Sequence, residues 1–388
     1  MVGYLTDWGS FNLINTLNYS ALTHINYAFA IPAVDGTIAI SNDSWLSSVV
    51  TKAHAKNVRV NISVGGWGAS DAFNPICSDP NLKSLFIDTL LNFVKAFNLD
   101  GIDIDWEFPS ANESNMYEQF IYDLRLQMYS LEVVMSKPLE LTAAVAMGFS
   151  NSQGISNTAV SYMDYINIMA YDADHSNGGD HSSVGVADAA LTFWNNTRGI
   201  NGSYLVLGVP FYTYGAYNQV SYKSFSSSDP AACYGSTDGV FYNTNTLFTY
   251  KVNSKPILET KADMVDNIDG AGMMIWELAQ DRTDQYSLLT VISKKMGTYV
   301  GVDEINENQM ISAYPNPFKE SFSINLSTLK ISNPTVKFTL SDITGKQILE
   351  SNHNSQGIIS IQENLNTGVY IGNISTHESN YTFKIVKQ

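Results

Sequence analysis

The sequence predicts an α/β protein of two domains, a (β/α)8 TIM barrel over residues 1–298 and a small all-β sandwich over residues 312–388. Three observations lead to this prediction. Up to about residue 298, short runs rich in β-branched and aromatic residues alternate with longer amphipathic stretches, which is typical of a barrel. No dinucleotide-binding or P-loop glycine motif occurs, which disfavours a doubly wound open sheet. Beyond residue 311 the hydrophobic period becomes two residues, as in β-strands.

The barrel requires eight strands separated by helices, and the sequence supplies both. The expected strands are Val2–Leu5, Ile25–Ala30, Val58–Val64, Gly101–Glu107, Glu140–Met147, Tyr165–Tyr171, Tyr204–Phe211 and Gly270–Glu277. The expected helices include Asp43–Lys56, Asn81–Phe97, Met116–Leu131 and Val186–Asn195. The polar residues 299–311 are predicted to be a linker.

The tail has a different composition of elements, with short alternating runs and no helical stretch between them. Its expected strands are Ser321–Leu326, Thr335–Leu340, Gln347–Leu349, Ile358–Ile361, Gly368–Ile374 and Tyr381–Val386. Turn-forming residues separate these runs, as in a small antiparallel sandwich.

The composition excludes several classes of function. The 388 residues include 37 acidic and 21 basic side chains, a formal net charge of -16, and 29 of the acidic residues lie before residue 301. This charge leaves no basic footprint for nucleic acid. The longest apolar runs, such as Leu205–Phe211, are too short to span a membrane. Cys77 and Cys233 form neither a disulfide framework nor a metal-ligand pattern. The aromatic content of 12% is compatible with a tyrosine-rich core or with a groove that stacks on sugar rings.

The fourth expected strand carries acidic residues where a barrel strand should be apolar. Asp103, Asp105 and Glu107 alternate with apolar residues, so the three carboxyl groups are expected to share one face, toward the barrel interior and its carboxyl-end mouth. A solvated strand end and a metal site remain alternatives, although no basic residue or further ligand lies within the motif. Crowded carboxyl groups raise one another's pKa, which suits Glu107 to act as a general acid.

This motif resembles the D-x-x-D-x-D-x-E signature of glycoside hydrolase family 18, the chitinases and their relatives. Three further segments resemble the family in order and spacing: Ser63–Gly66, Met169–Asp172 and Met274–Glu277. The resemblance covers residues 1 to about 298.

The resemblance implies a substrate-assisted mechanism with retention, in which the acetamido group of the substrate acts as the nucleophile. It implies catalytic roles for Glu107, Asp105, Asp103 and Tyr171. It also implies sugar contacts by Tyr4, Trp8, Tyr27, Trp67, Met169, Asp172, Tyr212 and Trp276, and no metal or cofactor. From the residues alone, a place in the packed barrel core is the favoured interpretation of Trp276 and Met169.

The sequence departs from the family pattern after the seventh strand. Tyr212 is followed by Thr213 and Tyr214 instead of a Gly-Arg pair, so no arginine is expected to touch the substrate there. The groove-deepening insertion found in some members is expected to be absent or much reduced, and a shallower cleft favours endo-acting cleavage.

The tail resembles the C-terminal sorting domain of the type IX secretion system of Bacteroidota, through Ala313–Phe318, Leu340–Gly345 and the closing strands. A carbohydrate-binding or fibronectin-like sandwich is the alternative, but all six tryptophans precede residue 300. The resemblance implies the type IX machinery as a partner and a secreted or cell-surface location. Such cargo carries a signal peptide, which we expect to be missing here because Met1 leads directly into the first strand.

The favoured function is therefore a secreted endochitinase that hydrolyses β-1,4 bonds between N-acetylglucosamine units. Two alternatives stay open, an endo-β-N-acetylglucosaminidase acting on N-glycans and a non-hydrolytic chitin-binding lectin of the same fold. The lectin is disfavoured because Glu107 is present.

Overall fold

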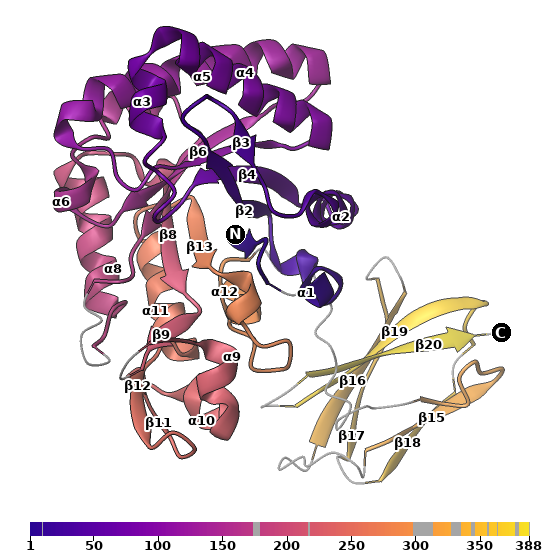
Figure 1. Cartoon of the computed structure of the whole chain (residues 1–388). Helices are drawn as coiled ribbons and strands as arrows, with labels where there is room; N and C mark the ends of the chain where they lie inside the picture. Colours follow the sequence, from indigo (N-terminus) through magenta and orange to yellow (C-terminus); the bar gives the residue numbers. More distant parts are fainter. Residues whose placement is uncertain are drawn as a thin grey trace. The chain divides into compact units, whose positions relative to one another are not determined.

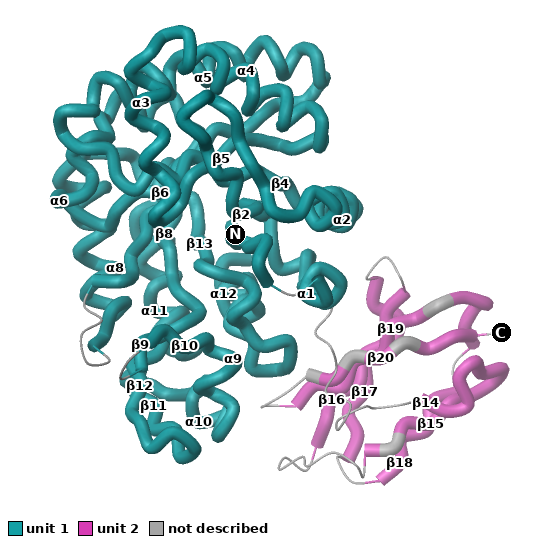
Figure 2. Tube along the Cα trace, in the orientation of Figure 1, with its two compact units in different colours: residues 1–300 teal, residues 301–388 magenta. Residues whose placement is uncertain are grey.

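The computed structural model describes residues 1–9, 11–173, 179–215, 218–297, 313–326, 335–342, 346–354, 357–362, 364–376 and 380–387. The chain divides into two compact units, residues 1–300 and 301–388 (Figure 2). The predicted linker over residues 299–311 lies outside the described residues.

Among the described residues of the first unit, eight parallel strands close into a barrel, because the first strand pairs with both the second and the last. The prediction of a (β/α)8 barrel is confirmed. In the order of the barrel wall, the strands are β1 (Val2–Thr6), β2 (His24–Pro32), β4 (Arg59–Gly65), β5 (Gly101–Asp105), β6 (Glu140–Ala146), β7 (Tyr165–Met169), β8 (Leu205–Pro210) and β13 (Gly272–Trp276).

Helices surround this barrel (Figure 1). The longer ones are α2 (Asp43–His54), α4 (Pro80–Phe97), α5 (Ser114–Met135), α8 (Val184–Leu191), α11 (Lys255–Asp266) and α12 (Leu288–Lys295). Shorter helices are α1 (Phe11–Thr16), α3 (Phe73–Ser78), α6 (Phe149–Ser152) and α7 (Asn157–Ser161). Local signals set their ends: α4 begins where the Asp79 carboxylate accepts hydrogen bonds from the backbone N–H groups of Asn81 and Leu82, and it ends at the left-handed Asn98.

Between β8 and α11 the chain forms only short elements within its described residues. They are β9 (Tyr212–Tyr214), β10 (Gln219–Ser221), α9 (Tyr222–Phe225), α10 (Pro230–Gly235), β11 (Val240–Asn243) and β12 (Phe248–Lys251). The two-residue strand β3 (Ile38–Ala39) pairs with the end of β2.

The barrel strands face two different environments. Ile102 and Ile104 of β5 belong to the apolar layer between barrel and helices, and Trp106 beyond them stacks on Phe73 with ring planes 8° apart. The opposite face of the same strand carries Asp103, which is fully buried in the interior. The strand therefore has an apolar outside and a polar inside, as its alternation predicts.

The second unit contains two antiparallel sheets among its described residues, which confirms the all-β prediction. One sheet consists of β14 (Ala313–Tyr314), β15 (Ser321–Asn325) and β18 (Ile358–Gln362), and the other of β17 (Gln347–Asn354), β16 (Thr335–Asp342), β19 (Gly368–Ser375) and β20 (Asn380–Lys387). A shared core joins them, in which Phe322 contacts Phe338 edge to face. Within the described part of the chain, no helix has the length and apolar character needed to cross a membrane.

We predict that Gly101→Ala destabilises the barrel. A Cβ at this position would lie 2.2 Å from the Glu140 backbone oxygen, in the pairing between β5 and β6. Such overpacking typically costs about 2 kcal/mol, and here the obstacle is backbone, which yields little. Thermal unfolding should show a lowered midpoint.

Gly235→Ala is the matched control, because a Cβ there meets nothing within 4 Å. Equal midpoints for the two variants would contradict the steric argument.

Candidate active site

The predicted catalytic residues come together at the mouth formed by the carboxyl ends of the barrel strands. Asp103 and Asp105 lie on β5, Glu107 follows the end of that strand, and Tyr171 and Asp172 follow β7. Parallel strands present all these ends at one face, which is where barrel enzymes place their chemistry.

Asp103 lies deepest and its carboxylate accepts four hydrogen bonds. Tyr4 Oη (2.7 Å) and Ser63 Oγ (2.8 Å) donate to Oδ2, while Thr142 Oγ1 (2.6 Å) and Asn167 Nδ2 (3.2 Å) donate to Oδ1. Burial raises the pKa of Asp103, and the four donors oppose that rise. Asp103 is thereby fixed in place below the reactive pair.

Asp105 and Glu107 form a hydrogen-bonded carboxyl pair above Asp103. Burial raises the pKa of Glu107 to about 7. The pKa of Asp105 lies well above its usual range, because burial and the charges of Glu107 and Asp103 act in the same direction. The pair therefore retains at least one proton near neutral pH, and Glu107 is the member that reaches the mouth.

Glu107 does not continue the strand as the sequence suggested. Strand β5 ends at Asp105, so the expected strand Gly101–Glu107 was too long at its carboxyl end. Ser70, in the loop after β4, replaces the missing strand pairing: its Oγ accepts a hydrogen bond from Glu107 N (2.9 Å) and donates to the Asp105 carbonyl (3.2 Å). The general-acid candidate is thus positioned by the neighbouring loop.

Asp172 has the opposite electrostatic environment. Its Oδ1 accepts hydrogen bonds from the hydroxyls of Tyr212 (2.6 Å) and Tyr214 (3.0 Å), and His181 Nδ1 lies 3.1 Å away. Burial alone would raise the pKa of Asp172, but these hydrogen bonds outweigh it and lower the pKa. Asp172 is therefore a carboxylate at neutral pH, beside a carboxyl pair that holds a proton.

Tyr171 lies between these two groups of carboxyls. Burial, together with the charges of Asp105 and Glu107, raises the pKa of Tyr171 well above its ordinary value, so its hydroxyl keeps its proton. Met169, on the same strand end, is half-buried and packs against the interior aromatic cluster. Tyr171 can therefore donate a hydrogen bond into the mouth at any physiological pH.

Aromatic rings form one side of the mouth. Trp276 stacks on Phe29 with centroids 5.6 Å apart, and Tyr4 meets it edge to face at 5.5 Å. Trp8 extends the group, 6.5 Å from Trp276, and is 62% exposed. Trp67 is 81% exposed at the end of β4. A flat apolar surface next to carboxyl groups suits a sugar ring.

Two of the predicted sugar contacts lie elsewhere. Tyr27 is fully buried in the layer between barrel and helices, where its hydroxyl donates to the Asn42 carbonyl at 3.2 Å, so the prediction that it lines the cleft is wrong. The cause is strand alternation, since Asn26 and Ala28 occupy the interior face of β2. Tyr4 is buried beneath the site and contacts Asp103, so it lies too deep to line the cleft.

Sequence reasoning missed several residues that shape the site. Asn26, Asn61 and Asn167 are buried in the barrel interior, and each interrupts an apolar strand, which was a usable signal. The other missed residues are Phe29, Ser70, Thr142, His181 and Tyr214. For His181 no local pattern existed, because its contacts to Asp172 and Tyr212 follow no strand or helix period.

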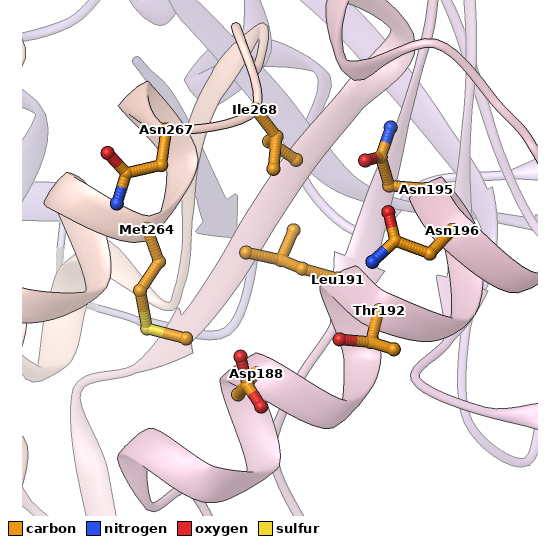
Figure 3. Close-up of a pocket in the computed structure, with 8 residues that line it drawn as sticks. All are labelled: Asp188, Leu191, Thr192, Asn195, Asn196, Met264, Asn267 and Ile268. Carbon is orange, nitrogen blue, oxygen red and sulfur yellow. The ribbon is translucent and has the colours of Figure 1, made fainter.

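A second hollow lies away from this mouth. It has a volume of about 170 Å³ and is lined by α8, the π-helical turn Thr192–Thr197 and the end of α11, with Asp188, Asn195 and Asn267 among its polar groups (Figure 3). Barrel helices run opposite to the strands, so the ends of these two helices lie toward the face opposite the mouth. Among the described residues, no group of three or more His, Cys, Asp or Glu side chains could hold a metal ion.

The chain is similar to known chitinases in sequence and fold. Chitinase 1 of Aphanocladium album is 24% identical over 379 residues, covering 81% of this chain and 88% of that protein. A chitinase-like effector of Moniliophthora roreri is 28% identical over 236 residues, but the match spans only 58% of that protein and 55% of this chain. The crystal structure of the GH18 chitinase ChiB from the chitin utilization locus of Flavobacterium johnsoniae has a TM-score of 0.64 and 28% identity, covering 76% of this chain and 93% of that one.

Two family models match adjoining parts of the chain. Residues 312–388 match the secretion system C-terminal sorting domain, which confirms the resemblance of the tail and indicates a secreted or cell-surface protein. Residues 1–281 match glycosyl hydrolases family 18. The chain therefore belongs to glycosyl hydrolases family 18.

Proposed function

We propose that this protein is a chitinase that hydrolyses β-1,4 bonds between N-acetylglucosamine units with retention, by substrate-assisted catalysis. One observation carries the proposal. Asp105 and Glu107 form a buried, hydrogen-bonded carboxyl pair at the mouth, and burial raises the pKa of Glu107 to about 7. Such a pair offers a proton to a leaving oxygen and, next to that acid, a carboxylate for the N–H of a substrate acetamido group.

The first step follows from these two groups. Glu107 donates its proton to the glycosidic oxygen, and the bond from that oxygen to the anomeric carbon breaks. At the same time the acetamido carbonyl oxygen bonds to the anomeric carbon, so the intermediate is a cationic oxazolinium ring. Asp105 accepts the acetamido N–H and stabilises the positive charge, while Tyr171 donates to the acetamido oxygen and orients it for attack.

The second step reverses the roles. Water attacks the anomeric carbon, Glu107 takes the proton from that water, and the acetamido group is restored. Two displacements at one carbon retain its configuration. Asp103 lies behind Asp105 and exchanges a proton or hydrogen bond with it, and Trp276 supplies the apolar floor under the reacting ring.

The proposed substrate rests on features of the barrel, and the proposed route of secretion rests on the tail. The exposed rings of Trp8 and Trp67 favour a polymer that extends beyond the reacting sugar, and the reduced segment between β8 and β13 favours internal cleavage. The tail favours export through the type IX secretion machinery as its partner. The N-glycan-cleaving enzyme and the lectin of the same fold remain outcomes of the first test below.

We predict that Glu107→Gln loses at least about 10³-fold in kcat on N-acetylglucosamine oligomers, because general acid–base catalysis contributes up to 10⁴-fold and the amide cannot transfer the proton. Turnover is measured by product chromatography, and oligomer binding by calorimetry should persist. Glu259→Gln, a half-exposed glutamate on α11, is the matched control.

Parallel assays on a high-mannose glycoprotein separate the alternatives. Glycan release without oligomer cleavage would identify the N-glycan enzyme, and binding without turnover in the unmodified protein would identify the lectin. Retained activity in Glu107→Gln would overturn the mechanism.

We predict that kcat/KM falls as the pH rises through about 7. Glu107 must carry its proton in the free enzyme, and its pKa is raised to about 7, so activity is present below that value and lost above it. The charge of Asp172 is one cause of the raised pKa. Asp172→Asn should therefore move the basic limb of the kcat/KM profile to lower pH, and a limb that stays in place would contradict this coupling.

We predict that a long oligomer yields products of several lengths early in the reaction. An open cleft lets the chain bind in many positions, whereas a deep one threads it from an end. Time-resolved mass spectrometry of a labelled oligomer of N-acetylglucosamine measures this distribution. Disaccharide released alone, from one end, would contradict endo action.

A further inference from the structure

A series of buried hydrogen bonds connects an outer helix to the strand end that carries Tyr171 and Asp172. It begins at Lys261 on α11, whose side chain is completely buried and whose ammonium donates to the Ser182 carbonyl (2.6 Å), Ser182 Oγ (3.0 Å) and Asn253 Oδ1 (2.6 Å). These three neutral acceptors use all three N–H bonds of the ammonium. Burial lowers the pKa of Lys261 to about 7, so holding a lysine here is costly and its three acceptors are a built arrangement.

Ser182 transmits this anchor to the strand end that carries the site. Its hydroxyl accepts from Lys261 and donates to the Ala170 carbonyl at 2.8 Å. Ala170 stands between Met169 and Tyr171 at the end of β7. Lys261 therefore fixes, through Ser182, the backbone that carries Tyr171 and Asp172.

His181, the residue before Ser182, completes the chain at Asp172. The histidine is 1% exposed and contacts the rings of both Tyr212 and Tyr214, with centroids 5.0 Å away in each case. Its Nε2 faces the Tyr212 carbonyl at 3.3 Å, which can only accept, so Nε2 carries a proton.

Nδ1 of His181 has two possible partners on one residue. It lies 3.1 Å from Asp172 Oδ1, an acceptor, and 3.2 Å from the Asp172 backbone N–H, a donor. The neutral ring accepts from the backbone, and the cationic ring donates to the carboxylate. Through these contacts His181 holds Asp172 in place, and Asp172 needs this support because its φ of 60° is a left-handed conformation, which residues other than glycine adopt at a cost.

We propose that His181, fixed from behind by Ser182 and Lys261, is a positioning residue that sets the place of Asp172 and Tyr171 against the substrate acetamido sugar. The inference rests on the proposed function and adds residues that the family signature does not contain. Two observations support the inference: the hydrogen-bonded path Lys261–Ser182–Ala170, and the two contacts from His181 to Asp172.

The charged and titratable groups around Asp172 define the pH behaviour that follows. Among the described residues, His181, Tyr212 and Tyr214 form hydrogen bonds with Asp172. The charge of Asp172 raises the pKa of Glu107 and of Tyr171. Asp180 is the charged neighbour of Lys261. Loss of His181 removes a group that keeps Asp172 ionised, so the pKa of Asp172 should rise.

The test compares His181→Leu, His181→Asn and Lys261→Met in the full chain, with a tetramer of N-acetylglucosamine as the substrate. His181→Leu should lose about 10- to 100-fold in kcat/KM, because displacement of a positioned group by about 1 Å costs this much. His181→Asn keeps an amide near the Nδ1 position and should recover part of the loss. Lys261→Met should also lower kcat/KM.

Two further readouts separate positioning from a merely structural role. The acidic limb of the kcat/KM profile is expected to report the protonation of Asp172, so in His181→Leu this limb should move to higher pH. The same substitution in the Glu107→Gln background should weaken tetramer binding, measured by calorimetry without turnover. The control is His54→Asn, since His54 pairs with Asp100 ahead of β5, at the other end of the barrel, and should leave both readouts unchanged.

The outcomes are distinguishable from failure of the proposed function. A folded His181→Leu variant with unchanged kcat/KM, unchanged acidic limb and unchanged tetramer affinity would overturn the inference while the wild-type activity stands. Loss of activity that tracks only the thermal midpoint, with the acidic limb in place and no recovery in His181→Asn, would also overturn it. A wild-type protein that does not hydrolyse the tetramer would instead refute the proposed function, and this inference with it.

Discussion

The structure of the catalytic end depends on one buried carboxylate. Asp103 has no exposed surface, and a carboxylate in such a place costs several kcal/mol unless its oxygens are satisfied. Its four donors come from four other strands, β1, β4, β6 and β7. The carboxylate of Asp103 on β5 therefore requires a layer of polar side chains across the barrel interior. This layer lies directly below Asp105 and Glu107.

Above this layer, carboxyl groups that meet at the mouth have opposite protonation behaviour. Asp105 and Glu107 share a desolvated corner and keep a proton, whereas Asp172 receives hydrogen bonds from two tyrosines and stays ionised. Environments that push neighbouring pKa values apart are how one site holds an acid and a charged group together. The charge of Asp172 also raises the pKa of Glu107, so this carboxylate helps keep the candidate acid protonated.

The two units divide the work of the chain. The barrel carries 29 of the 37 acidic residues and all six tryptophans, and it alone has the carboxyl cluster and the aromatic floor. The tail is built from two small sheets around a phenylalanine-rich core and matches a sorting domain. The proposed chemistry uses only four of the acidic residues of the barrel, Asp103, Asp105, Glu107 and Asp172.

The sequence alone determined the barrel, the tail and the carboxyl cluster, because strand alternation and motif order are local properties of the chain. The same alternation, applied to β2, would have turned Tyr27 outward, since Asn26 marks the interior face. Tertiary structure decided the rest. The end of β5 at Asp105 is set by a serine on the neighbouring loop, and Lys261 reaches Ser182 across 79 positions. Such contacts form only when the barrel closes, because they join strand ends and helices that are far apart in the sequence. No hydrophobic periodicity predicts which of these segments will meet.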